Sequence, residues 1–223
     1  MRLINNKPSP FGRKVMIALK EKDIPFEIEW DIPWHKDTTV DHYNPLEQLP
    51  ILVTEGGEIV YESSYILDWL EHHYPDPSLI PETPDERLKM KLFQVLGVGV
   101  MDAIVRINFE LARPQECQSN EWMQRQKRKI AGGLGEISRI IGNEEFAVGG
   151  QLTLADLEIG SVLGHLDFLA ESIPALTELF VRDIQWRNRH PNLGRYIDNL
   201  EQRASFKEAA PQMVEIDFQS VIH

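Results

Sequence analysis

The sequence has little cysteine, no long apolar run and a shortage of positive charge. Cys117 is the only cysteine among 223 residues, which excludes an intrachain disulfide framework and a cysteine-rich metal site. No window approaches the ~20 apolar residues of a membrane span, and residues 1–22 contain no apolar stretch long enough for a signal peptide. We therefore expect a cytoplasmic protein with no membrane partner.

The shortage of positive charge also limits the class of partner. Thirty-five acidic side chains outnumber 23 lysines and arginines, which gives a formal net charge of −12. A phosphate backbone would be repelled over most of this surface, so we expect no nucleic-acid partner. One local basic run, Arg125 to Lys129, is of a kind that more often forms a solvated helix face than a binding patch.

The first 76 residues alternate short apolar runs with amphipathic stretches. Alternating and helical spacings predict a small mixed sheet with helices packed on it, because a strand, a helix and a second strand form a right-handed parallel unit. The strands are expected at 2–5, 26–30, 51–54 and 58–61, and the helices at 10–22 and 63–74. The first helix is expected to bury a stripe that includes Val15 and Leu19, with Arg13 and Lys14 on other sides.

A proline-rich stretch marks a change in organisation. Four prolines fall between residues 75 and 84, which indicates a linker, assigned to 77–87, before an all-helical domain over 88–223. Helices are expected from Thr83–Pro84 to before Pro114, over 120–141, after Thr153 and over 191–200. Thr153 and Asp156 form a capping pair before a helix that is apolar on nearly all sides. The pattern assigns no element to 170–183.

The most informative segment is Ser9-Pro10-Phe11-Gly12-Arg13, between the first strand and the first helix. Pro10 falls in the first helical turn, where its missing N–H does no harm. Ser9 therefore lies where unpaired N–H groups and the positive end of a helix dipole meet, a suitable place to stabilise an anion such as a thiolate. A serine in this position is more often only a helix cap.

Two later dipeptides help to decide whether Ser9 is only a helix cap or also stabilises an anion. Leu49-Pro50 precedes a strand, and if its peptide bond is cis, the backbone of Leu49 can pair with an extended peptide. Glu62-Ser63 begins the next helix, where a carboxylate can bind an ammonium group and the hydroxyl and free N–H groups can bind a carboxylate. Together they would hold a zwitterionic amino-acid end, although the dipeptide alone is more often a simple helix start.

In order and spacing these motifs resemble the cytosolic glutathione transferase family, in the form found in bacteria with serine at the catalytic position. The motifs are Ser9-Pro10-Phe11 with Arg13 and Lys14, Asn44-Pro45, Leu49-Pro50, Glu62-Ser63 and Thr153 to Asp156. The resemblance implies a thioredoxin-like N-terminal α/β domain that holds glutathione and an all-α C-terminal domain that forms a pocket for a hydrophobic electrophile. It also implies a homodimer.

The resemblance assigns roles to individual residues. Ser9 matches the catalytic position and would hydrogen-bond the glutathione thiolate. Because serine cannot form a mixed disulfide, we do not expect the thiol exchange of relatives with cysteine there.

The glutathione-binding positions follow in the same way. Leu49 matches the residue whose backbone pairs with the cysteinyl part, Pro50 the cis-proline, and Glu62 and Ser63 the pair that holds the γ-glutamyl end. Gln48 occupies a position from which a side chain often reaches the tripeptide. His35 and Lys36 are poorly aligned candidates for the glycine carboxylate, and Trp34 fits core and pocket lining equally well.

The expected function is conjugation of glutathione, as cosubstrate, to small hydrophobic electrophiles. The alternative is a non-catalytic binding or regulatory protein of the same fold, because a fold does not settle activity. We expect no metal, since Glu71-His72-His73 lacks metal-ligand spacing. Cys117 has no partner cysteine, and His165 is expected to be a hydrogen-bonded core residue.

Overall fold

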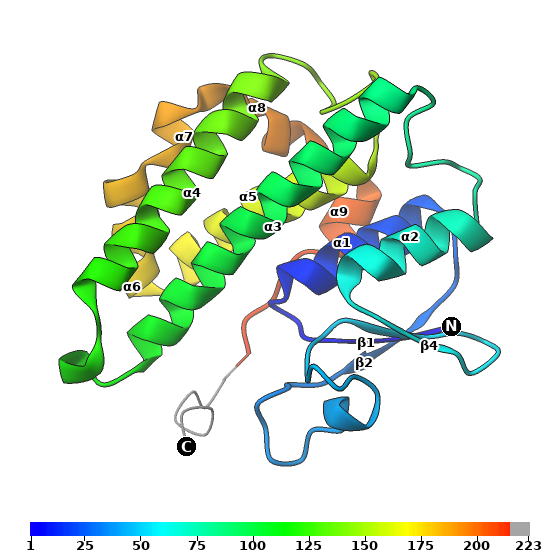
Figure 1. Cartoon of the computed structure of the whole chain (residues 1–223), viewed down its shortest axis with the longest axis horizontal. Helices are drawn as coiled ribbons and strands as arrows, with labels where there is room; N and C mark the ends of the chain where they lie inside the picture. Colours follow the sequence, from blue (N-terminus) through cyan, green and yellow to red (C-terminus); the bar gives the residue numbers. More distant parts are fainter. Residues whose placement is uncertain (215–223) are drawn as a thin grey trace. The chain divides into compact units, whose positions relative to one another are not determined.

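The computed structural model describes residues 1–214 of the chain, which divide into two compact units (Figure 1). The first unit contains Met1–Leu79 together with residues 203–214, and the second contains Ile80–Gln202. The sequence predicts instead that everything after residue 87 belongs to the helical domain. In the structure, residues 203–214 belong to the first unit.

The first unit is built on a mixed four-stranded sheet. Strand β1 (Arg2–Asn5) pairs in parallel with β2 (Glu27–Trp30) and antiparallel with β3 (Ile51–Val53), which pairs antiparallel with β4 (Ile59–Tyr61). The strand order is β2-β1-β3-β4. The small mixed sheet predicted from the sequence is therefore confirmed.

Alternation along the strands gives the sheet two apolar faces. Ile4 and Ile51 are directly paired and form a buried cluster with Val40, which lies in the short 3-10 helix η1 (Val40–His42). The neighbouring positions Leu3 and Leu52, also paired, point to the opposite face and are fully buried. Figure 1 shows helices α1 (Pro10–Glu21) and α2 (Ser63–His73) lying side by side over the sheet.

Helix α1 is buried on more sides than its apolar stripe predicts. Arg13 and Lys14, expected away from the packed stripe, are only 3% and 1% exposed, so that expectation is wrong. Lys14 lies 3.5 Å from Ser64 Oγ of α2, and Arg13 donates from Nη2 to the Phe206 carbonyl oxygen at 3.3 Å. Each long cation is covered because a different helix packs against α1 on that side.

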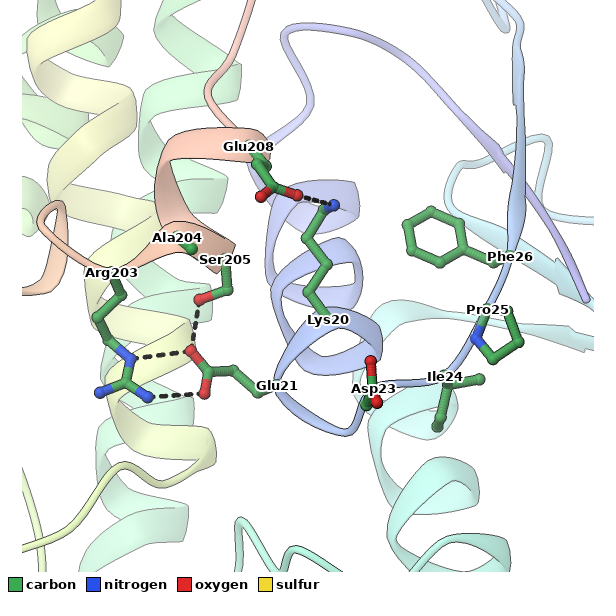
Figure 2. Close-up of a pocket in the computed structure, with 10 residues that line it drawn as sticks. All are labelled: Lys20, Glu21, Asp23, Ile24, Pro25, Phe26, Arg203, Ala204, Ser205 and Glu208. Carbon is green, nitrogen blue, oxygen red and sulfur yellow. Dashed lines mark hydrogen bonds and ion pairs between the residues drawn. The ribbon is translucent and has the colours of Figure 1, made fainter.

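The second of these helices is α9 (Ala204–Glu208), near the end of the described chain (Figure 2). Arg203 and Glu21 form a two-point ion pair at 2.7–2.8 Å, Ser205 also donates to Glu21, and Lys20 pairs with Glu208 at 2.5 Å. Burial alone would raise the pKa of Glu21, but the hydrogen bonds from Arg203 and Ser205 outweigh it and lower the pKa. The contacts fix α9 on α1.

The second unit is helical. Its longest helix, α3 (Pro84–Ala112), lies beside α4 (Asn120–Ile141) in Figure 1, and α3 also packs with α5 (Leu154–Ser172). The shorter helices that follow are α6 (Pro174–Thr177), the π-helix η3 (Glu178–Ile184), α7 (Trp186–Arg189) and α8 (Pro191–Leu200). The predicted helix over 120–141 is confirmed to the residue, and an all-helical second part follows the α/β part, as expected.

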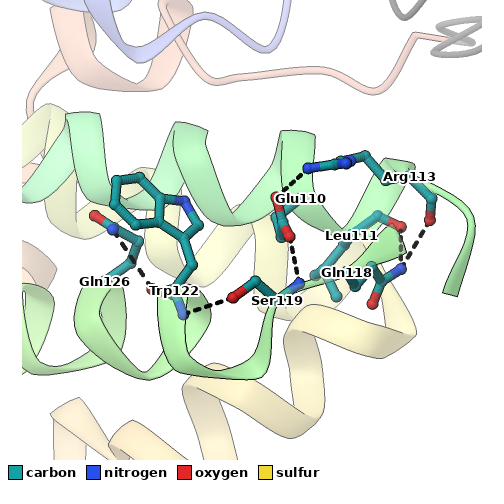
Figure 3. Close-up of polar contacts among 7 residues, drawn as sticks. All are labelled: Glu110, Leu111, Arg113, Gln118, Ser119, Trp122 and Gln126. Carbon is teal, nitrogen blue, oxygen red and sulfur yellow. Dashed lines mark hydrogen bonds and ion pairs between the residues drawn. The ribbon is translucent and has the colours of Figure 1, made fainter. Parts of the chain in front are cut away.

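The turn between α3 and α4 is held by side chains (Figure 3). It includes the short 3-10 helix η2 (Gln115–Cys117). Glu110 accepts a 2.6 Å hydrogen bond from Ser119 N–H, and Gln118 Nε2 donates to the carbonyl oxygen of Arg113 at 2.8 Å. Ser119 Oγ in turn accepts from Trp122 N–H and caps α4. These contacts satisfy backbone groups that the two helix ends leave open.

By length and composition alone, α3 is apolar enough to cross a membrane, so the expectation that no window approaches a membrane span is wrong. The core helices of globular proteins meet the same test, and 44% of its most apolar window is buried among the described residues. Leu88, Leu92 and Val95 remain exposed on this helix. The length of α3 is therefore weak evidence for a membrane span, and the cytoplasmic location stays a prediction.

The predicted capping pair at the start of α5 is present and is extended by two further contacts. Asp156 accepts hydrogen bonds from the Thr153 N–H and hydroxyl, from Ala147 N–H and from the Tyr196 hydroxyl, all at 2.7–2.8 Å. Burial raises the pKa of Asp156, while these donors oppose the rise. One buried carboxylate therefore joins α5 to α8 and to the segment before it.

Replacing this carboxylate should destabilise the second unit. Asp156→Ala leaves four donors without their acceptor, and we expect a loss of about 3–5 kcal/mol in the free energy of unfolding, the range for breaking a buried charged network. Asp156→Asn keeps part of the acceptor capacity and should lose less. Urea unfolding of the three proteins measures both effects, and an Ala variant within 0.5 kcal/mol (roughly the range of a neutral surface change) of the wild type would contradict this role.

Candidate functional site

The strand register brings three sequence motifs to one edge of the sheet. Ile4 pairs with Ile51, and Ile51 pairs with Tyr61. The chain therefore leaves β1 toward Ser9, enters β3 from Leu49-Pro50 and leaves β4 into Glu62-Ser63, all at the same edge. Segments that are up to 54 residues apart in sequence are thus grouped by backbone pairing.

Ser9 caps helix α1 and still has a proton to donate. Its Oγ accepts a 3.1 Å hydrogen bond from Gly12 N–H, and its backbone has the extended conformation of a cap residue. Among residues 1–214, no acceptor is recorded for the Ser9 hydroxyl proton. The cap interpretation and the catalytic one are therefore compatible, because they use different parts of the hydroxyl.

Gly12 is required by the close approach of Asn5. A Cβ atom on Gly12 would lie 1.7 Å from Asn5 Oδ1, far inside van der Waals contact. Asn5 ends β1 and is only 1% exposed. The absence of a side chain at residue 12 thus lets the helix that carries Ser9 lie directly against the sheet.

Leu49 and Pro50 are joined by a cis peptide bond. Neither backbone group of Leu49 has a hydrogen-bond partner in the described part of the chain, so both are available to an added extended peptide. Gln48 is exposed, and its carbonyl oxygen accepts a 2.8 Å bond from Asn44 Nδ2. That bond fixes the loop just before Leu49.

Glu62 caps α2 with its own carboxylate. It accepts from Ser64 N–H at 3.0 Å, from Tyr65 N–H at 3.3 Å and from the Ser63 hydroxyl at 3.0 Å. Its φ of +69° lies in the region that favours glycine, a strained conformation of the kind that clusters at functional sites and costs about 1–3 kcal/mol. Ser63, 2% exposed, is turned toward this carboxylate.

Lys14 adds a buried positive charge that sequence reasoning missed. Burial alone would raise the pKa of Glu62, but hydrogen bonds from Ser64 and Ser63 and the charge of Lys14 outweigh it and lower the pKa. The carboxylate is therefore ionised at neutral pH, as binding an ammonium group requires. A buried lysine is rare without a charged partner. The burial of Lys14 could not be predicted from helical spacing, because Lys14 lies outside the apolar stripe of the helix.

The three remaining candidate binding residues, Trp34, His35 and Lys36, lie in the loop that follows β2. Because β2 is parallel to β1, with Asn5 opposite Trp30, the loop that carries them leaves the sheet at the same edge. His35 and Lys36 are exposed, and Trp34 is partly buried. Within residues 1–214, the structure records no hydrogen bond or ion pair of His35 or Lys36 with Ser9, Leu49 or Glu62. A role for these candidates in binding a carboxylate stays a prediction.

No group of three or more His, Cys, Asp or Glu side chains suited to a metal ion occurs in residues 1–214. Cys117 is exposed and unpaired.

His73 stacks on Trp69 with ring centroids 4.0 Å apart, which gives part of the Glu71-His72-His73 stretch a packing role.

Comparison with known families places both parts of the chain. Residues 8–73 match the model of the glutathione S-transferase N-terminal domain, and residues 120–199 match that of the C-terminal domain. The chain belongs to the glutathione S-transferase family. The uncharacterized GST-like protein YibF from Escherichia coli is 33% identical over 95% of this chain and 98% of its own length.

Two solved structures share this fold over nearly the whole chain. A glutathione S-transferase from Methylobacterium radiotolerans, in complex with glutathione sulfonate, is 46% identical with a TM-score of 0.88 and covers 96% of both chains. A glutathione S-transferase from Methylobacillus flagellatus, with glutathione bound, is 28% identical with a TM-score of 0.85 and covers 95% of this chain and 99% of that one. The thioredoxin-like first part and the helical second part agree with the expected fold class.

Proposed function

We propose that this glutathione S-transferase conjugates glutathione to small electrophiles and that Ser9 stabilises the reacting thiolate. The observation that carries the proposal is the grouping of Ser9, Leu49 and Glu62 at one sheet edge. The hydroxyl proton, the peptide groups and the carboxylate there suit the thiol, the backbone and the ammonium group of one tripeptide. The bound glutathione and glutathione sulfonate of the two relatives support the same ligand.

In the proposed complex, glutathione lies across the edge as an additional extended segment. The backbone N–H and C=O of Leu49 pair with the cysteinyl residue, and cis-Pro50 holds Leu49 in that orientation. The γ-glutamyl ammonium pairs with Glu62. Its carboxylate takes the N-terminal end of α2 and the Ser63 hydroxyl, which turns from Glu62 to the ligand. Gln48 extends from the same loop toward the tripeptide.

The Ser9 hydroxyl then faces the sulfur. A thiol with a pKa of about 8.5 is only a few per cent ionised at neutral pH, and lowering that pKa by about two units needs roughly 2.7 kcal/mol of preferential thiolate stabilisation. A hydrogen bond to a charged group contributes ~1.5–3 kcal/mol and a helix N-terminus ~0.3–2 kcal/mol. The two together are sufficient.

The reaction itself is nucleophilic attack by the thiolate. The thiol proton leaves to solvent, the sulfur forms a bond to an electrophilic carbon, and in a substitution the leaving group departs with its electron pair. Ser9 forms no covalent bond, so its contribution is electrostatic. We infer an electrophile of small size with a hydrophobic body, and the proposed steps use no metal ion.

Exposed apolar side chains on α3 support a homodimer. Leu88, Leu92 and Val95 are 71%, 44% and 69% exposed and fall on one side of the helix by their spacing. An apolar stripe of this kind is suited to contact with a second copy of the chain. Light scattering should give a particle of twice the mass of one chain.

Ser9 variants test the proposed mechanism. Ser9→Ala and Ser9→Gly both remove the hydroxyl, but alanine also costs about 1 kcal/mol of helix capping whereas glycine costs only a few tenths. We expect both to raise the pKa of bound glutathione by about one to two units, which the ultraviolet absorbance of the thiolate measures during a pH titration. Ser9→Thr should retain the wild-type value, and an unchanged titration in both Ala and Gly variants would remove Ser9 from the mechanism.

The non-catalytic alternative is separated by two assays. A transferase should be retained on immobilised glutathione and should also turn over an activated aryl halide. Retention without turnover would favour a binding protein, and failure of both would favour a protein that uses the fold for another interaction. The Ser9 hydroxyl and the ionised Glu62 favour the enzyme.

A further inference from the structure

A small recess adjoins Ser9 on the β2 side of the sheet. It has a volume of about 40 Å³, and its lining includes Lys7, Ser9 and Trp30 together with Ala209 and Gln212. All of these residues belong to the first unit. A cavity volume of about 10–15 Å³ suffices for one water molecule, which has one non-hydrogen atom. The recess therefore has room for a group of about three non-hydrogen atoms.

The recess contains a cation without an acidic partner. The Lys7 ammonium lies 5.8 Å from the centre of the Trp30 ring, and the structure records no other side-chain contact for it within residues 1–214. Among the described residues, Glu208 supplies the one carboxylate on the recess, and it is already paired with Lys20 at 2.5 Å. A partly buried ammonium group on an aromatic face is therefore available to an anion.

A second observation points to a polar ligand at the same place. Asn5 lines the recess and is 1% exposed, yet its Oδ1 has no hydrogen-bond partner among the described residues. Its Nδ2 meets only the sulfur of Met16 at 3.5 Å, which is a weak acceptor. A buried amide with both ends poorly satisfied is uncommon in native proteins. Its Nδ2 is suited to a stronger acceptor than sulfur, and its Oδ1 to a donor such as a bridging water.

The end of the described chain forms the outer wall of the recess. Gln212 N–H donates to the Lys7 carbonyl oxygen at 3.4 Å. The wall is anchored through α9, because Arg203 and Ser205 bind Glu21 on α1 (Figure 2). The recess is therefore a built feature of the first unit.

We propose that this recess is the part of the second-substrate site nearest the sulfur and that Lys7 makes it selective for electrophiles that carry a carboxylate. The inference rests on the proposed function, since it places the sulfur beside Ser9. A carboxylate has three non-hydrogen atoms, which matches the volume. It accepts hydrogen bonds from the ammonium group of Lys7 and from Asn5 Nδ2, which would give up the weak acceptor Met16 Sδ. On a surface with a net charge of −12, a local cation is needed to bind such an anion.

Either of two molecules in the proposed complex could supply the carboxylate that enters the recess: the electrophile or glutathione itself. Leu49 and Glu62 lie on the β3–β4 side of β1, whereas Trp30 lies on β2, so the recess is on the other side of β1 from the groups that hold the cysteinyl and γ-glutamyl parts. Ser9 itself is one of the residues that line the recess. We therefore assign the recess to the carboxylate of the electrophile. The experiment below distinguishes this carboxylate from the glycine carboxylate of glutathione.

Two conjugates that differ by one charge provide the test. S-(2-carboxyethyl)glutathione and S-(2-carbamoylethyl)glutathione share the tripeptide and the chain length, and calorimetry gives the Kd of each for the wild type, Lys7→Met and Lys7→Arg. We expect the wild type to prefer the acid by about tenfold, the scale of one charge-assisted contact. The preference should fall to about one in Lys7→Met and return in Lys7→Arg. Lys89→Met, which removes a lysine from α3, is the matched control and should keep the preference.

The outcomes separate this inference from the proposed function. Binding of both conjugates with no preference for the acid, or a preference that survives in Lys7→Met, would overturn the role of Lys7 alone. Equal losses for the acid and the amide in Lys7→Met would assign Lys7 to the tripeptide and would also overturn the inference. If the wild type binds neither conjugate nor glutathione, the proposed function fails and the inference fails with it.

Discussion

The backbone pairing of β1, β3 and β4 is the constraint on which the site depends. Ile4 opposite Ile51 and Ile51 opposite Tyr61 fix the ends of three strands at one edge. A shift of one residue in this register would turn Ile4 and Ile51 from their buried cluster to the other face, so the apolar core and the site are specified by the same contacts. The fold therefore places a hydroxyl, a free peptide edge and a carboxylate together before any ligand binds.

Helix α1 links this edge to the rest of the first unit. Its start carries Ser9, and Gly12 lets it lie against Asn5. Its two buried cations serve different neighbours, because Lys14 faces Glu62 and Ser64 on α2 while Arg13 contacts Phe206 on α9. A helix enclosed in this way keeps its N-terminal end in a fixed position, which is what electrostatic stabilisation of a thiolate requires.

Much of the fold follows from local sequence signals. Strand alternation, the Pro10 and Pro84 helix starts and the capping pair at Thr153 all predict the elements within a few residues of where they lie. The motifs at Ser9, Leu49-Pro50 and Glu62-Ser63 were visible as well, because each combines a turn or cap with a polar group. Their grouping depends on the strand register, which the spacing of residues in one sequence does not specify.

Other features had no local signal. Residues 178–184 form a π-helix, whose hydrogen bonds span five residues, so the usual helical spacing does not identify it. Lys14 and Arg13 look like solvated positions until the helices that cover them are known. The return of residues 203–214 to the first unit depends on ion pairs such as Arg203 with Glu21, between residues 182 apart.

The measurement that tests this account most directly is a crystal structure of the protein with glutathione bound. The account predicts an extended tripeptide at the edge formed by β1, β3 and β4, with both backbone groups of Leu49 paired to its cysteinyl residue, its ammonium group on Glu62 and its sulfur within hydrogen-bond distance of Ser9 Oγ. Glutathione bound elsewhere, or bound at this edge with its sulfur turned away from Ser9, would contradict it.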